Sequence, residues 1–228
     1  MRFRDRAEAG QKLAGVLTPY RSGDVCVLGL TRGGLRVAYE VARGLRAPLD
    51  LWVARRLRVP GGRLLLGAVA EGGGLYLDPQ AAVQAKLPGE TLQRFVHEEL
   101  DDVEHQARQL RGGLTPRIRG CTALLVDDGM VTGATVTAAL LALKQQGVRQ
   151  RIVAVGVATP RALELVRSRA DAVHALTLDP SLREVSEAYD IFPALTQDEL
   201  RRWLTRAREA SPARPEGVAP DMAGGWWF

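Results

Sequence analysis

The sequence is poor in cysteine, in lysine and in long apolar runs, and each shortage excludes a class of protein. Its two cysteines, Cys26 and Cys121, both lie in apolar runs, which excludes a disulfide framework and a cysteine-ligated metal cluster. No apolar run approaches the about 20 residues that a transmembrane helix needs. Residues 1–17 also lack the apolar centre of a signal peptide. These shortages predict a cytoplasmic protein that does not enter a membrane.

Lysine is scarce although the chain is basic. The 228 residues carry a formal net charge of +5, yet only three of them are lysine, so arginine supplies almost all the positive charge. Aromatic residues make up 5% of the sequence, and no basic run is interleaved with them as a binder of single-stranded nucleic acid would require. The arginines are scattered along the whole chain, which favours small-molecule partners over nucleic acid.

Short apolar runs alternate with segments of helical periodicity. Strands are expected at 25–30, 49–54, 121–126, 151–158 and 172–178, and helices at 5–17, 35–45, 90–111, 134–147 and 160–169. Most of these strands are apolar throughout, as in a parallel sheet that helices cover on both faces. A hairpin is expected from 64–70 and 75–78, and a basic loop at 55–63. The pattern predicts a doubly wound α/β fold with a mostly parallel central sheet.

The stretch LLVDDGMVTGAT (124–135) places two acids, Asp127 and Asp128, at the end of an expected strand. Ligands of open parallel sheets bind outside the carboxyl ends of the strands. The small-residue loop that follows runs into a helix, so its backbone N–H groups, its threonine hydroxyls and the positive helix end can converge on a phosphate. Adjacent acids beside a phosphate site make sense if they accept hydrogen bonds from sugar hydroxyls of the same ligand and favour a sugar carbon that becomes positive.

Other interpretations of this stretch are weaker. The acids would merely end a strand, and Thr132 would merely cap a helix, but a cap does not require two adjacent acids. A Walker-type phosphate loop is excluded because no lysine precedes Thr135, and the chain has no intact G-x-G-x-x-G for a dinucleotide.

The motif resembles the phosphoribosyl-diphosphate (PRPP) motif of the type I phosphoribosyltransferases, and the resemblance covers residues 21–178. It implies an enzyme of nucleotide salvage that transfers the 5-phosphoribosyl group from PRPP to a nitrogen nucleophile, with a nucleobase as the expected acceptor and Mg²⁺ as cofactor. Asp127 and Asp128 would be catalytic. The 5-phosphate site would comprise Val131, Thr132, Gly133, Ala134 and Thr135.

Two further segments resemble parts of this family. GLTRGG (29–34) is similar to the loop that binds the diphosphate, and the implied residues are Thr31, Arg32, Gly33 and Gly34. Its glycines would permit close approach and unusual backbone dihedrals. Taken alone, the segment favours an ordinary strand-to-helix turn, and the motif at 124–135 makes the diphosphate loop the preferred interpretation. The basic loop 55–63 corresponds to the family's mobile loop, where Arg55, Arg56 or Arg58 would neutralise the leaving diphosphate; the alternative is a solvated loop.

The sequence departs from the family at one informative position. Val131 stands where members that use 6-oxopurines carry an aspartate that acts as general base, so the acceptor must lose its proton elsewhere or not at all. No protein ligand is expected for Mg²⁺, which would be held by the diphosphate, the ribose hydroxyls and water. The alternative to an enzyme is a regulatory protein that keeps the PRPP pocket as a sensor. Both alternatives are compatible with a homo-oligomer.

A single domain is expected over residues 1–209, with the core at 21–178 and a hood over the acceptor formed by 1–20 and 179–209. A tail, 210–228, ends in two tryptophans and a phenylalanine that we expect to dock in an apolar groove of the same subunit or of a neighbour. Among residues outside the motifs, His97, Asp101 and His105 share a helical face that a metal could use, but a solvated face is the preferred interpretation. His174 is expected in the core, and the aromatic residues of 189–192 are expected to anchor the C-terminal segment.

Overall fold

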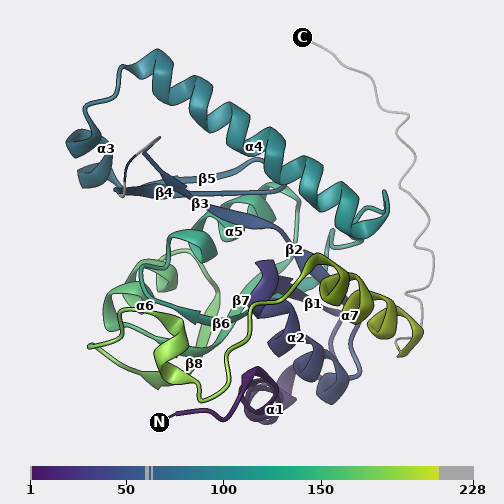
Figure 1. Ribbon diagram of the computed structural model, residues 1–228. Coiled ribbons are helices and arrows are strands. Elements are labelled where there is room, and N and C mark those ends of the chain that lie inside the picture. The colour runs from purple at the N-terminus through teal and green to yellow at the C-terminus, as the bar shows by residue number, and fades with distance from the viewer. Residues whose placement is uncertain (1, 60–61, 63, 211–228) are drawn as a thin grey trace.

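The computed structural model describes residues 2–59, 62 and 64–210 (Figure 1). The expected docking of the terminal aromatic residues 226–228 lies outside these residues. A five-stranded parallel sheet forms the centre, in the order β2-β1-β6-β7-β8. Its strands are β1 (Val25–Leu30), β2 (Leu49–Trp52), β6 (Thr122–Met130), β7 (Gln150–Ala158) and β8 (Ala172–Leu178). The expected doubly wound α/β class is therefore confirmed.

Helices cover both faces of this sheet. One face packs against α1 (Arg6–Val16), α2 (Thr31–Leu45) and α7 (Gln197–Ala210), and the other against α5 (Ala134–Gln145) and α6 (Pro160–Arg167). Short 3-10 helices lie at Thr18–Tyr20 and Val185–Ala188. The last helix, α7, is attached to α2 through Trp203, whose ring lies 4.7 Å from that of Tyr39 and 4.4 Å from the Arg36 guanidinium carbon.

A second sheet of three antiparallel strands packs on the outer side of α5. It comprises β3 (Ala54–Arg58), β4 (Leu65–Ala70) and β5 (Gly74–Leu77), and helices α3 (Pro79–Ala85) and α4 (Gly89–Arg111) complete this layer (Figure 1). The β4–β5 hairpin was expected. The loop expected at 55–63 is wrong for its first four residues, because Arg55 to Arg58 pair with β4 and extend the hairpin into a three-stranded sheet.

A buried group of charges joins this layer to the parallel sheet. The Arg111 guanidinium donates to both carboxylate oxygens of Glu71 at 2.5 and 2.7 Å, to the Leu51 carbonyl at 2.6 Å and to Asp50 at 3.1 Å. Glu71 in turn accepts the Val53 N–H at 2.6 Å. Burial raises the pKa of Glu71 despite the facing guanidinium. The cluster fixes the end of β2, where the chain leaves one sheet for the other.

None of the described helices has the length and apolar content that crossing a bilayer requires.

Candidate active site

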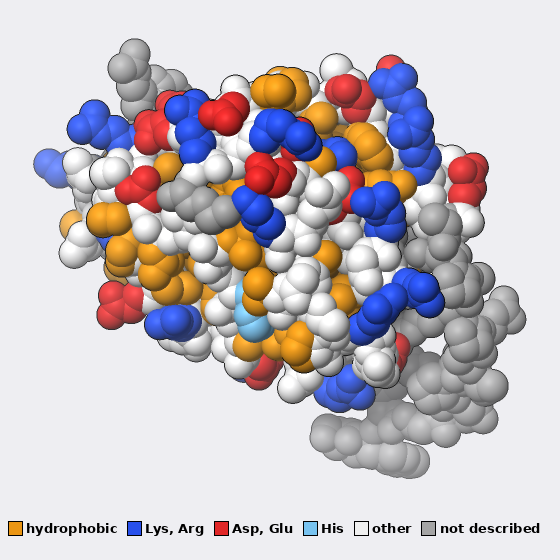
Figure 2. All heavy atoms as spheres, turned by 90° about the horizontal axis from the view of Figure 1, so that it is seen from below, with side chains coloured by type: hydrophobic (Ala, Val, Ile, Leu, Met, Phe, Trp, Pro, Cys, Tyr) orange, Lys and Arg blue, Asp and Glu red, His pale blue; other side chains and the backbone are white. Residues whose placement is uncertain are grey.

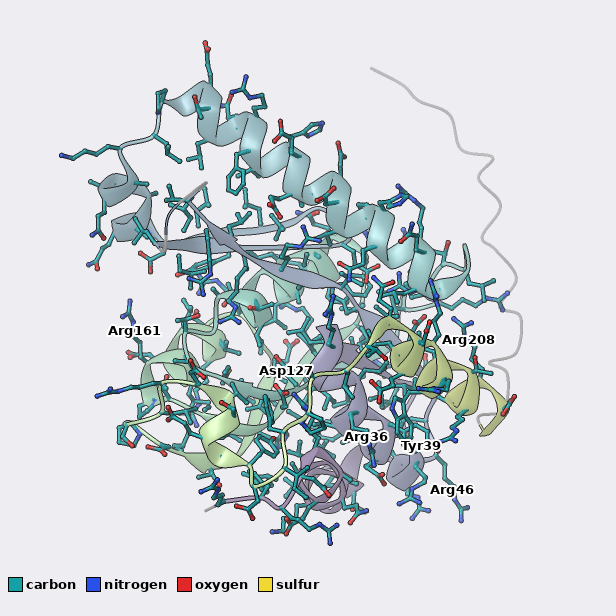
Figure 3. The ribbon with its side chains drawn as sticks, viewed as in Figure 1. Arg36, Tyr39, Arg46, Asp127, Arg161 and Arg208 are labelled. Atoms are coloured by element: carbon teal, nitrogen blue, oxygen red, sulfur yellow. The ribbon has the colours of Figure 1, made fainter. Side chains whose placement is uncertain are left out.

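The acid pair lies inside β6, one strand from the start of α2. We expected the acids to follow the strand, but β6 continues to Met130 because Asp127 and Gly129 still pair with β7. The neighbouring strand β1 pairs with β6 up to Gly29–Val126 and ends at Leu30, where α2 begins. Figure 3 shows Asp127 near the centre of the molecule, whereas Arg161 and Arg46 lie at opposite edges.

The first turn of α2 packs directly on the acids. A Cβ on Gly33 would lie 2.7 Å from Cγ of Asp128, and one on Gly34 would lie 2.5 Å from the Val126 carbonyl oxygen and 2.9 Å from Oδ1 of Asp127. The expected loop at residues 31–34 is therefore wrong, since these residues are helical. Their glycines serve close approach; neither Gly33 nor Gly34 has a positive φ. The free N–H groups and the positive end of the helix dipole adjoin the carboxylates.

Asp128 is buried and held by contacts from distant parts of the chain. Its Oδ2 accepts from Nε of Arg6 at 2.8 Å, and both side chains are about one-tenth exposed. Its backbone carbonyl accepts from the Tyr189 hydroxyl at 2.6 Å. Burial and the two nearby carboxylates raise the pKa of that tyrosine. The sequence offered no sign that Arg6 or Tyr189 would meet an acid so distant in the chain.

Asp127 has a different environment. The residue as a whole is half-buried, and its Oδ1 accepts the N–H of Asp128 at 2.9 Å. Among the ion pairs of the described residues, none involves Asp127. Burial and the adjacent charge of Asp128 hold the pKa of Asp127 well above its usual value. The two acids are adjacent in sequence but chemically unlike.

The conformation of the loop between β6 and α5 depends on a glycine and on two threonines. Gly133 caps α5 with φ 76°, in the left-handed region that favours glycine, and no side chain caps the helix. The Thr132 hydroxyl accepts weakly from the Ala134 N–H at 3.4 Å, and Thr132 is exposed. Thr159, at the end of β7, donates to the Val131 carbonyl at 2.7 Å. Sequence reasoning missed Thr159, which fixes the start of the loop.

The arginines of β3 point to opposite faces of the three-stranded sheet. Arg55 pairs with Glu99 at 3.1 Å and Asp102 at 3.2 Å, both on α4. Arg56 is exposed and stands opposite Ala68, which belongs to the apolar cluster around α5. Arg56 therefore shares the α5 side of the sheet, and Arg55 is engaged on the other.

His97 and His174 each contact a residue other than the two acids. His97 is 3.7 Å from Asp101, and both side chains are more than 70% exposed, as a solvated helix face requires. His174 is only partly buried, in contrast to the expected core position, and its ring nitrogen lies 3.1 Å from the Tyr20 hydroxyl. Among the described residues no group of three or more His, Cys, Asp or Glu side chains is arranged to hold a metal.

A separate hollow of about 230 Å³ follows the edge strand β8. Figure 2 shows hydrophobic side chains gathered around a histidine on this side of the molecule. The hollow shares no residue with the acid site. It is lined by Val16, Leu163, Arg167, Val173, His174, Ala175, Leu176 and Leu178.

Comparison with known proteins agrees with this geometry, although no family model matches the chain. The crystal structure of TT1426 from Thermus thermophilus is similar with a TM-score of 0.75 and 38% identity, covering 90% of this chain and 99% of that one. Two curated Mycobacterium tuberculosis proteins, from strains CDC 1551 and H37Rv, are named "Putative phosphoribosyl transferase" and are 34% identical over 211 residues. The match covers 90% of this chain and 47% of each relative, so the chain spans about half of their length. The chain is thus similar over most of its length to proteins named as phosphoribosyl transferases, and it shares its fold with TT1426.

Proposed function

We propose that the protein transfers the 5-phosphoribosyl group from PRPP to a nitrogen nucleophile and releases diphosphate. The observation that carries this proposal is that the first turn of α2 packs on the acid pair, while the loop that follows the acids leads into the N-terminus of α5. Neither Leu30, which precedes α2, nor Gly133, which precedes α5, supplies a side-chain cap, and in α5 the Ala134 N–H makes only the long 3.4 Å bond to the Thr132 hydroxyl. The free N–H groups of the two helices suit two anionic groups, and the acids suit the sugar that joins those groups in PRPP.

Each part of PRPP has a place in this proposal. The 5-phosphate binds the loop and first turn of α5, residues 131–135, and the diphosphate binds the first turn of α2, residues 31–34. The ribose hydroxyls donate to the acid pair. Arg56, on the α5 side of its sheet, is a better candidate for the leaving diphosphate than Arg55, whose guanidinium already pairs with two acids on α4.

The reaction is a displacement at the anomeric carbon, which becomes positive as its bond to the diphosphate lengthens. A negative carboxylate close to the ribose stabilises that charge more in the transition state than in the ground state, and so raises the turnover rate. Mg²⁺ on the diphosphate would supply positive charge to the leaving group, with oxygen ligands from the diphosphate, the ribose hydroxyls and water.

The acceptor in this proposal is a nucleobase or another nitrogen compound that needs no strong base. Val131 offers no proton acceptor at the start of the loop, and its carbonyl is already bound by Thr159. Nucleophiles that attack through a nitrogen with a free lone pair are therefore favoured.

Calorimetry with PRPP and Mg²⁺ tests the proposal. Thr135→Ala and Gly133→Val should each weaken PRPP binding at least about tenfold, because one removes a hydroxyl donor and the other disturbs the N-terminus of α5. Thr205→Ala, at an exposed position of α7, is the matched control and should bind like wild type. Wild-type protein that does not bind PRPP would overturn the proposal. Tight PRPP binding without transfer to any acceptor would instead identify a PRPP-sensing regulator.

A further inference from the structure

The geometry points to Arg6 as a positioning residue that gives the two acids different roles. Arg6 fixes Asp128 to the segment 189–193, and Asp127 is left as the acid that carries the negative charge toward the ribose. This inference rests on the proposed function and adds to it a residue outside both motifs.

The first step concerns how Arg6 is held. It is the first residue of α1 and is 8% exposed. Its Nε donates to Oδ2 of Asp128 at 2.8 Å, its Nη1 donates to the Pro193 carbonyl at 2.7 Å, and its guanidinium carbon lies 3.6 Å from the centre of the Phe192 ring. Arginine presents its donors in a rigid plane, so these three contacts determine the orientation of the group. Arg6 therefore links Asp128 to the 189–193 segment.

The second step concerns the same segment seen from Asp128. The Tyr189 hydroxyl donates to the Asp128 carbonyl at 2.6 Å, and the Tyr189 ring lies 5.1 Å from that of Phe192. A Cβ on Gly156 of β7 would lie 2.5 Å from this hydroxyl, so glycine is needed to admit it. Both the backbone and the side chain of Asp128 are thus bound to the 189–193 segment.

The third step concerns the helix that carries Arg6. Gly10 lets α1 approach α2 closely, since a Cβ there would lie 2.5 Å from the Val37 carbonyl oxygen. Gly44 does the same from α2, where a Cβ would lie 2.7 Å from that of Ala14. The first turn of α2 also packs on the acids, so α1 and the acid pair both pack against α2. Arg6 has little freedom to leave Asp128.

The fourth step concerns charge. Two adjacent buried carboxylates repel each other, and without a cation they tend to share a proton. Arg6 places its positive charge against Asp128, with Nε 2.8 Å from Oδ2. The charged groups that act on Asp127 are Asp128 and Arg6, and the Tyr189 hydroxyl donates to the Asp128 backbone carbonyl beside them. With Arg6 in place, the acid pair retains negative charge for the ribose at lower pH than it would otherwise.

The experiment measures PRPP affinity with Mg²⁺ by calorimetry between about pH 5.5 and pH 8.5 for wild type, Arg6→Gln, Arg6→Lys and Arg4→Gln. An opposite charge at this distance shifts a carboxyl by about 1–3 pH units, so the pH at which affinity is half-maximal should rise by about one unit or more in Arg6→Gln. Arg6→Lys restores the charge and should return the midpoint toward wild type. Arg4→Gln removes the same charge from an exposed side chain nearby and should leave it unchanged.

Affinity that falls equally at every pH in Arg6→Gln would show a structural role only and overturn the inference. Should Arg6→Gln fail to fold, the double variant Arg6→Gln/Asp128→Asn removes both charges and should keep the wild-type midpoint, because Asp127 then has no acidic neighbour. If wild type binds no PRPP, the proposed function fails, and NMR titration of the Asp127 carboxyl carbon still decides the role of Arg6. An Asp127 midpoint that is the same in wild type and Arg6→Gln refutes it.

Discussion

Replacing Gly33 by alanine probes the contact on which the site depends. The added methyl would lie 2.7 Å from Cγ of Asp128 and closer still to Oδ2. Carbon atoms pack best at about 3.5–4.0 Å, so the two groups must separate by about 1 Å. Asp128 cannot simply turn away, because Arg6 holds its Oδ2 at 2.8 Å. Either the first turn of α2 lifts from β6 or the buried ion pair breaks.

The expected cost follows from these two routes. Forcing an extra methyl into a packed site costs about 1–3 kcal/mol, and breaking a buried ion pair costs about 3–5 kcal/mol, so the helix should move and the lower range should apply. Gly15→Ala is a matched control in α1, where a Cβ would meet nothing within 4 Å. Alanine is favoured over glycine in a helix by about 0.5–1 kcal/mol, so this control should be stabilised.

Urea unfolding with linear extrapolation gives both free energies, and PRPP calorimetry gives the functional effect. Gly33→Ala should lose PRPP affinity as well as stability, since the diphosphate site and the acids shift together. An unfolding free energy for Gly33→Ala that equals that of Gly15→Ala would refute the close-packing argument.

The remaining predictions concern charge and the acceptor. Asp127→Asn should raise the free energy of unfolding at about pH 8 but not at about pH 4. The pKa of Asp127 is higher in the native state than in the unfolded state, so the wild-type protein loses stability as the carboxyl ionises with rising pH, and asparagine does not ionise. Urea unfolding at both pH values checks this. Arg111→Met should destabilise by about 3–5 kcal/mol by leaving Glu71 buried and unpaired, whereas Arg108→Met, exposed on the same helix, should stay within about 0.5 kcal/mol in the same assay. If Val131 reflects the absence of a base, transfer assays should show hypoxanthine and guanine as poorer acceptors than adenine; efficient turnover of hypoxanthine would contradict this.

The parts of the fold that could be predicted from sequence are those with strong local patterns. The strand expected at 25–30 has the same first and last residues in the structure, and the helix expected at 134–147 spans Ala134–Gln145. The apolar stripe of 90–111 recurs in α4, where Val96, Val103, Ala107 and Leu110 are buried. In each case a run of apolar residues decides the conformation within one element.

Structure that depends on pairing between distant segments could not be predicted. Arg55 to Arg58 contain a single apolar residue and look like a loop, but their pairing with β4 makes them a strand. The first turn of α2 was similarly hidden, since glycines lower helix propensity and here persist because larger residues would strike β6. No local pattern reveals a neighbour that lies across the sheet.

The candidate site shows the same division. The motif at 124–135 identified the acids, but not that they would differ. Arg6 lies 122 residues from Asp128 and looked like one more arginine in an arginine-rich chain. Its partner became visible only when α1 was seen packed on α2. Motif residues were accessible to sequence reasoning, whereas the residues that set their charge were not.

The asymmetry of the acid pair has a consequence for stability. Burying a carboxylate costs several kcal/mol unless a cation or hydrogen bonds offset it, and Arg6 forms an ion pair with Asp128 but acts on Asp127 only through its more distant charge. A negative charge on Asp127 is costly to the native state, which its raised pKa expresses. A purely structural position would be occupied more stably by asparagine, which keeps the oxygen that accepts the Asp128 N–H. The cost of an aspartate at position 127 is therefore explained by a ligand that needs its charge, such as a sugar that becomes positive during transfer.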